Sequence, residues 1–289
     1  MDGLICKSQR AQVLVQALPY IQRYWNRVVV IKYGGHAMES EELKAQVMED
    51  IVLLQLVGVK VVLVHGGGPE INDTLDAMGV KTEFVNGLRV TDAETAQVVQ
   101  MVLAGKVGKS LVNLIETTGG KAMGICGIDG RMVEAKSKSS ALGYVGDITH
   151  VNVEPIKDLL EKGYIPVVSS LGCDAEGNVY NINADTMAAH ISGAMGAECL
   201  ISMTDIAGIM EDPADPASLI PVADINDAVE LFRRGIIKGG MIPKVESCIE
   251  ALLCGVKKVF ILDGRIPHSI LLEMLTDEGS GTMMVGEKK

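Results

Sequence analysis

Near the N-terminus the chain runs Val28-Val29-Val30-Ile31-Lys32-Tyr33-Gly34-Gly35-His36. Four consecutive β-branched apolar residues predict a strand buried on both faces, as in the centre of a parallel sheet. The two glycines end this strand and allow a ligand to approach their N–H groups closely. A lysine beside such amides favours a site for anionic oxygens such as phosphate, although an ordinary strand end with a solvated lysine has the same sequence.

A second strand–glycine–helix junction follows in the same third of the chain. Residues 59–64 predict another buried strand, and His65-Gly66-Gly67-Gly68-Pro69 then leads into a predicted helix over 70–78. Proline is tolerated in the first turn of a helix. Because neighbouring parallel strands end on the same side of a sheet, we expect both glycine loops to line one crevice.

The composition narrows the class of protein. With 289 residues, 48% hydrophobic and only 3% aromatic, the chain can hold one large α/β domain or two lobes that share a sheet. A net charge of −11 argues against a nucleic acid or an anionic membrane as partner. The cysteines show neither disulfide nor metal-ligand spacing, and no apolar run approaches the length of a membrane helix. We therefore expect a cytoplasmic protein without a metal site of its own.

Hydrophobic periodicity predicts further elements along the chain. We expect helices over 41–56, 93–104, 153–163, 186–195, 244–253 and 270–275, and strands over 164–170, 199–203 and 256–262, the last being the final core strand. Residues 121–150 predict β-hairpins that cover or edge the sheet. Residues 9–25 predict an amphipathic helix, which Pro19 should break near residues 17–18. This leading helix must cover a groove of its own chain or a partner, a simple packing helix being the alternative.

Polar side chains follow several predicted strands. Arg89 comes after an Asn-Gly turn, and its guanidinium suits a carboxylate held by two hydrogen bonds, although a surface ion pair is a commoner role for arginine. Asn181, Asn183 and Asp185 alternate ahead of a predicted helix, and capping of that helix accounts for only one of the three. Lys244 follows a third glycine-rich segment.

The pair Lys32 and Lys244, with Asp185, fits phosphoryl transfer. That reaction requires in-line positioning and neutralisation of the phosphate oxygens, with little covalent work by the protein. Asp185 could hold both lysines, and Mg²⁺ would be carried mainly by nucleotide oxygens and water. A carboxylate acceptor is already ionised at pH 7 and requires no general base. The chain has no Walker, protein-kinase or G-x-S-x-G motif.

Six motifs make nearly the whole chain resemble the amino acid kinase family. They are Lys32-Tyr33-Gly34-Gly35, His65-Gly66-Gly67-Gly68, Asn86-Gly87-Leu88-Arg89-Val90-Thr91, Asn181-Ile182-Asn183-Ala184-Asp185, Thr204-Asp205-Ile206-Ala207-Gly208-Ile209 and Gly240-Met241-Ile242-Pro243-Lys244. The third and fourth resemble the acylglutamate branch. The resemblance implies a three-layer αβα sandwich with a mainly parallel central sheet. It would comprise a kinked oligomerisation helix (1–26), an N-lobe for the acyl amino acid (27–180) and a C-lobe for the nucleotide (181–289).

The resemblance also implies a reaction, in which ATP phosphorylates the side-chain carboxylate of N-acetyl-L-glutamate in arginine biosynthesis. Lys32 and Lys244 would stabilise the transferring phosphoryl group, and Asp185 would orient them. The acyl amino acid would be bound by Gly67, Gly68, Arg89, Asn181 and Asn183. The nucleotide would be bound by Gly34, Gly35, Asp205, Ile206, Ala207, Gly208, Ile209, Met210, Ile236, Ile237 and Lys238.

Regulation follows from the same resemblance. In arginine-inhibited members a kinked N-terminal helix joins dimers into a hexamer, and residues 9–25 resemble that helix. The resemblance places the arginine site at Tyr24, His268, Glu278 and Gly279. A PII-type signal protein binds photosynthetic relatives, but nothing in this sequence shows the surface it requires.

Two alternatives stay open. The first is a kinase for a related acyl amino acid, such as a carrier-linked aminoadipate, because pocket shape sets the substrate length. The second is a non-catalytic regulatory subunit on the same fold. Loss of either lysine or of Asp185 would favour the second, and all three are present.

Overall fold

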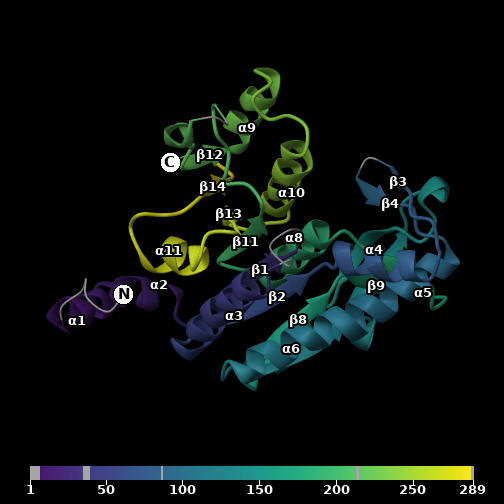
Figure 1. Cartoon of the computed structure of the whole chain (residues 1–289), viewed down its shortest axis with the longest axis horizontal. Coiled ribbons are helices and arrows are strands. Elements are labelled where there is room, and N and C mark those ends of the chain that lie inside the picture. Colours follow the sequence, from purple (N-terminus) through teal and green to yellow (C-terminus); the bar gives the residue numbers. More distant parts are fainter. Residues whose placement is uncertain (1–6, 35–39, 86, 213–214, 288–289) are drawn as a thin grey trace.

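The computed structural model describes residues 7–34, 40–85, 87–212 and 215–287. Its centre is an eight-stranded sheet with helices on both faces (Figure 1). Across the sheet the strands are β12 (Val222–Asp224), β14 (Thr282–Val285), β13 (Lys258–Asp263), β11 (Cys199–Thr204), β1 (Val28–Tyr33), β2 (Lys60–His65), β8 (Ile165–Ser169) and β5 (Ala122–Cys126). The strands from β13 to β5 are parallel, whereas β14 is antiparallel to β13 and parallel to β12. The expected mainly parallel sheet is confirmed.

Strand β1 lies inside the sheet with both faces buried. Val29 and Ile31 pack into one apolar cluster and Val30 into the other. The first face is covered by α3 (Glu41–Leu56), α4 (Gly68–Ala77), α5 (Ala93–Gln100), α6 (Gly108–Thr117) and α11 (Ser269–Leu275). The second is covered by α7 (Glu154–Glu161), α8 (Ala184–Met195), α9 (Ile225–Arg233) and α10 (Met241–Leu253). These three layers are the expected αβα sandwich.

The carboxyl ends of the parallel strands share one edge of the sheet. From β1 the chain proceeds to β2 on one side, whereas its other neighbour, β11, comes from the second half of the sequence. In open α/β sheets such a reversal of strand order leaves a crevice for ligands. The glycine loops after β1 and β2 both begin at this edge, because Tyr33 and His65 are register partners.

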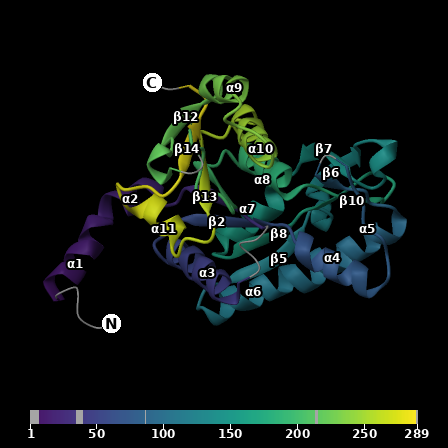
Figure 2. The same cartoon turned by 45° about the horizontal axis from the view of Figure 1, so that its top comes forward.

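Two small sheets accompany the main one (Figures 1 and 2). One contains β6 (Val133–Ser137), β7 (Gly146–Val151), β9 (Leu171–Cys173) and β10 (Val179–Asn181), and the other is the hairpin of β3 (Phe84–Val85) and β4 (Leu88–Arg89). The antiparallel pair β6–β7 is a hairpin of the kind expected within 121–150. The expectation was wrong for β5, which is a parallel edge strand of the main sheet beside β8.

A continuous helix from α5 through α6 is longer than the sequence predicted. A π-helical segment, Met101–Val107, joins the two, so the predicted end at residue 104 was wrong. The combined Ala93–Thr117 is also long and apolar enough to cross a membrane, contrary to our expectation that no segment would be. Its buried side packs on the sheet, with Val98, Val99, Leu111 and Ile115 in the core.

Strand β14 corrects the expectation that residues 256–262 form the final core strand. Its four residues insert between β13 and β12. Only long-range pairing stabilises so short a strand, and local periodicity does not reveal that pairing.

The leading helix is broken as Pro19 predicted. It divides into α1 (Lys7–Gln16) and α2 (Leu18–Tyr24), with the proline in the first turn of α2. Figure 2 shows α1 reaching away from the rest of the chain. Its apolar residues Val13, Leu14 and Val15 are 57%, 75% and 60% exposed.

Candidate active site

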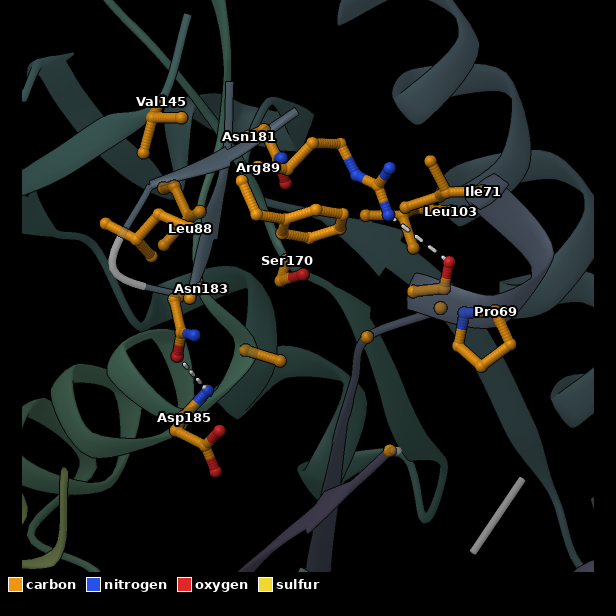
Figure 3. A pocket seen from close by; sticks show the side chains of 18 of the residues that line it. Pro69, Ile71, Leu88, Arg89, Leu103, Val145, Ser170, Asn181, Asn183 and Asp185 are labelled. Carbon is orange, nitrogen blue, oxygen red and sulfur yellow. Dashed lines mark hydrogen bonds between the residues drawn. The ribbon is translucent and has the colours of Figure 1, made fainter. Parts of the chain in front are cut away.

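A cavity of about 210 Å³ lies at the carboxyl edge of the sheet (Figure 3). It is lined by Lys32, Gly34, Gly66, Gly67, Gly68, Pro69, Ile71, Phe84, Gly87, Leu88, Arg89, Leu103, Val145, Ser170, Asn181, Ile182, Asn183, Ala184 and Asp185. In Figure 3 Arg89 and Asp185 lie at opposite ends, with Ser170 between them. The cavity therefore brings together residues from both glycine loops and from the Asn-x-Asn-Ala-Asp motif.

An ion pair between Lys32 and Asp185 forms one end of the cavity. Lys32 Nζ is 3.0 Å from Asp185 Oδ1, and both side chains are less than a quarter exposed. Lys32 is near the end of β1, beside Ser202 of β11, and Ser202 Oγ is 3.5 Å from the same carboxylate oxygen. The ion pair thus holds Lys32 at the carboxyl edge of the sheet, where its side chain lines the cavity.

Two helices begin at the cavity. Gly68 starts α4 and Ala184 starts α8, and unpaired N–H groups at a helix N-terminus favour an anion. Asn183 caps α8, since its Oδ1 accepts hydrogen bonds from the N–H groups of Asp185 (2.8 Å) and Thr186 (3.1 Å). Capping therefore accounts for the carbonyl of Asn183 and leaves its NH₂ group as a donor for a ligand.

Arg89 forms the opposite end of the cavity. It is only 7% exposed, and its guanidinium lies 4.7 Å from the centroid of the Phe84 ring. Nη2 donates to the carbonyl of Gly68 at 3.3 Å, while Nη1 is buried without a hydrogen-bond partner among the described residues. Burial lowers the pKa of Arg89. A buried guanidinium with a vacant donor is suited to a carboxylate.

Asn181 is held beside Arg89 by the neighbouring loops. Its Nδ2 donates to Thr91 Oγ1 at 3.3 Å, and its backbone N–H donates to the carbonyl of Tyr144 at 2.8 Å. The Asn181 carbonyl can accept an N–H from a ligand.

Lys244 has a different partner from the one expected. It lies in α10 and pairs with Asp205, which directly follows β11, rather than with Asp185. The hydrogen bond from Lys244 lowers the pKa of Asp205 to about 2. Among the described residues Asp185 pairs with Lys32 and Asp205 with Lys244, so each lysine has its own carboxylate.

Six of the predicted nucleotide residues, Asp205 to Met210, directly follow β11, and the three at 236–238 lie between α9 and α10. Ile209 and Ile237 are 1% and 3% exposed, and both backbone groups of Ile209 are engaged, because its N–H donates to Thr282 Oγ1 at 2.8 Å and its carbonyl accepts from the N–H of Ile220 at 2.8 Å. Gly208 has φ of 141°, and a Cβ there would lie 2.6 Å from Thr282 Oγ1. Gly34 lines the cavity, whereas Gly35 lies outside the described residues.

The four predicted effector residues are not among the residues that line the cavity. A groove of about 630 Å³ between α1, α2, α3 and α11 is lined by His268 and Glu278, among others, and Gly279 follows directly. Tyr24 is buried, 3% exposed, and burial raises its pKa to about 12. Tyr24 therefore belongs to the core rather than to this groove.

Sequence reasoning missed several residues of the cavity wall. Phe84 is the cross-strand partner of Arg89, and the Asn-Gly turn between them was a usable signal for this pairing. Leu103 comes from the π-helical segment, and Ser170 follows β8. No local pattern marks those two, because the sheet and the long helix bring them to the cavity.

The chain is similar in sequence and in fold to known members of one protein family. The model of the amino acid kinase family matches residues 27–263. The chain is 54% identical to acetylglutamate kinase from Synechococcus elongatus over 280 residues, 96% of this chain and 93% of the relative. It is also 54% identical to acetylglutamate kinase from Clostridium beijerinckii, over 96% of this chain and 98% of the relative. The structure of N-acetylglutamate synthase from Neisseria gonorrhoeae, complexed with coenzyme A and N-acetyl-glutamate, superposes with a TM-score of 0.83 at 24% identity. That superposition covers 96% of this chain and 64% of the other, and it shows a shared fold.

Proposed function

The chain belongs to the amino acid kinase family, and from that premise we propose that it is an acetylglutamate kinase of arginine biosynthesis. ATP would phosphorylate the side-chain carboxylate of N-acetyl-L-glutamate. The observation that carries this function is one cavity with a buried guanidinium at one end and the Lys32–Asp185 pair at the other. Those ends fit the two carboxylates of one short dicarboxylic substrate.

Arg89 is the residue that we assign to the α-carboxylate. Its vacant Nη1 and its shielding by Phe84 favour a charge-assisted contact. The NH₂ of Asn183 and the carbonyl of Asn181 would hold the acylated amino group. Apolar residues of the same cavity, among them Leu88 and Val145, would surround the acyl chain.

The chemistry takes place at the Lys32 end. There the side-chain carboxylate of the substrate attacks the γ-phosphorus, the new P–O bond forms, and ADP leaves. Lys32 and Lys244 would neutralise the oxygens of the transferring group, while the N–H groups of Gly67 and Gly68 would donate to the acyl amino acid. The acceptor is ionised at neutral pH, so no general base is required.

The nucleotide would lie over the loop 205–210 and residues 236–238, in the C-lobe (181–289), with the acyl amino acid in the N-lobe (27–180). Mg²⁺ would enter with ATP and neutralise phosphate charge. It binds through few carboxylates plus phosphate and water, which suits a site without a three-residue cluster of His, Cys, Asp or Glu among the described residues.

We propose further that arginine inhibits the enzyme. The groove beside α1 and α2 carries Glu278, and an exposed carboxylate suits a guanidinium. The exposed apolar side of α1 favours assembly into a larger homo-oligomer, for which we propose a hexamer. A cytoplasmic location follows from the metabolic role.

The test is ADP release with N-acetyl-L-glutamate, compared with glutamate, carbamate and aspartate, and repeated with arginine added. We expect turnover with the acyl amino acid alone and a reduced rate with arginine. N-Acetyl-L-2-aminoadipate tests the alternative substrate, because its chain is longer by one methylene. Preference for it would replace the proposed substrate, and no turnover with any acceptor would favour the regulatory subunit.

A further inference from the structure

A buried polar cluster lies directly behind the cavity. His65 ends β2 and Ser169 ends β8, and the two are register partners. They are 0% and 2% exposed, and His65 Nε2 is 2.9 Å from Ser169 Oγ. Ser169 Oγ is also 3.1 Å from the carbonyl of Leu103, and His65 Nδ1 is 2.8 Å from the carbonyl of Gly66.

The donors and acceptors of this cluster follow from its chemistry. Gly66 O can only accept, so Nδ1 carries the proton and donates to it. Burial lowers the pKa of His65 to about 4, so its imidazole is neutral at pH 7 and Nε2 is an acceptor. The Ser169 hydroxyl has a single proton and two acceptors in reach, Nε2 and Leu103 O, so it donates to one of them at a time. His65 is thus bonded to the glycine loop, and Ser169 lies between His65 and the carbonyl of Leu103 in the long helix.

The Leu103 carbonyl is also bonded within the π-helical segment. Gly108 N–H donates to Leu103 O five residues back, the bond that defines a π turn. A Cβ at Gly108 would lie 3.0 Å from Leu103 O, 3.1 Å from Ser169 Oγ and 3.2 Å from His65 Nε2. A side chain at this position would therefore crowd all three atoms of the cluster.

The glycine loop itself rests on the same segment. A Cβ at Gly67 would lie 2.8 Å from Leu103 Cδ2 and 3.1 Å from Val107 Cγ2. Gly66, Gly67 and Leu103 all line the cavity. A shift of the π segment or of the Gly66 carbonyl would therefore move the loop amides relative to a ligand.

We propose that His65 and Ser169 are positioning residues that lock the Gly66–Gly67–Gly68 loop onto the π-helical segment and so set the cavity for its acyl amino acid. Neither side chain lines the cavity, so they act through the loop. The assignment rests on the proposed function of that cavity, and it predicts an effect on the acyl amino acid rather than on ATP.

Steady-state kinetics of four variants test this positioning role, which we call the lock between the glycine loop and the π-helical segment. Ser169→Ala and His65→Leu each remove a buried hydrogen bond, and we expect kcat/KM for N-acetyl-L-glutamate to fall about tenfold or more with KM for ATP nearly unchanged. His65→Asn places an amide N–H near the Gly66 carbonyl, so it should restore most of the loss of His65→Leu. Gly108→Ala crowds the cluster without removing a polar group and should resemble Ser169→Ala. The lock is contradicted if these variants match the parent, or if both KM values rise together.

Gly105→Ala is the matched control. Gly105 lies in the same π-helical segment, and nothing lies within 4 Å of a Cβ built there. We expect kinetics within about twofold of the parent. An equal loss in Gly105→Ala and Gly108→Ala would assign the effect to the helix as a whole and overturn the lock.

Amide hydrogen exchange separates this inference from the proposed function. In Ser169→Ala, exchange of residues 66–71 and 101–108 should accelerate about tenfold, with β1 unchanged. If the parent phosphorylates no acyl amino acid, the proposed function fails. Hydrogen exchange in Ser169→Ala still shows whether His65 and Ser169 hold the loop against the π-helical segment. Unchanged exchange in both segments would refute it even in an active enzyme.

Discussion

Replacing Arg89 by methionine removes the guanidinium and keeps an unbranched apolar side chain of similar length. The buried Nη1 has no partner among the described residues, and Nη2 makes one 3.3 Å bond to Gly68. A substrate carboxylate would accept two charge-assisted hydrogen bonds, worth about 1.5 kcal/mol each at the lower end of their range. The loss of about 3 kcal/mol corresponds to a KM for N-acetyl-L-glutamate higher by on the order of 100-fold.

The same variant should leave the fold intact. Because burial lowers the pKa of Arg89, its charge is costly in the free protein, and Arg89→Met should keep or raise the thermal unfolding midpoint. KM for ATP should stay within about twofold. Arg131→Met is the control, since Arg131 is exposed and bonds the carbonyl of Asp174. An equal rise of both KM values, or a lower midpoint with unchanged KM, would refute the assignment.

Three further predictions concern the lysines, pH and α1. Lys32→Ala or Lys244→Ala should lower kcat for ADP release by roughly 10²–10³, and an unchanged kcat in both would contradict the phosphoryl role. Burial raises the pKa of Asp50, which is 2.6 Å from His268 Nδ1, from 3.8 to about 6. The folded state then binds the Asp50 proton more tightly than the unfolded state does, so the free energy of unfolding should fall by up to about 3 kcal/mol as the pH rises from 4 to 7. Chemical denaturation at several pH values should show this dependence, and the Asp50→Asn variant should reduce it. Removing residues 1–16 should leave an active, smaller oligomer by light scattering that arginine no longer inhibits, and retained inhibition would place the effector elsewhere.

Local patterns predicted elements whose stabilisation is itself local. The helix over 41–56 matches α3, because Ser40 caps it and its apolar residues recur on one side. The break at Pro19 was equally predictable, since the ring prevents a continuous helix. Strand β14 and the edge position of β5 were not, because long-range pairing decides both.

In the candidate site, too, some features depend on neighbouring residues and others on the tertiary structure. The sequence by itself determined that lysine and glycine follow buried strands, that Asn183 precedes a helix, and that Arg89 follows a tight turn, because strand ends, caps and turns depend on neighbouring residues. Only the tertiary structure decided which charges meet. It paired Lys32 with Asp185 and Lys244 with Asp205, because the packing of α8 and α10 against the sheet, not distance along the chain, sets which side chains lie close together.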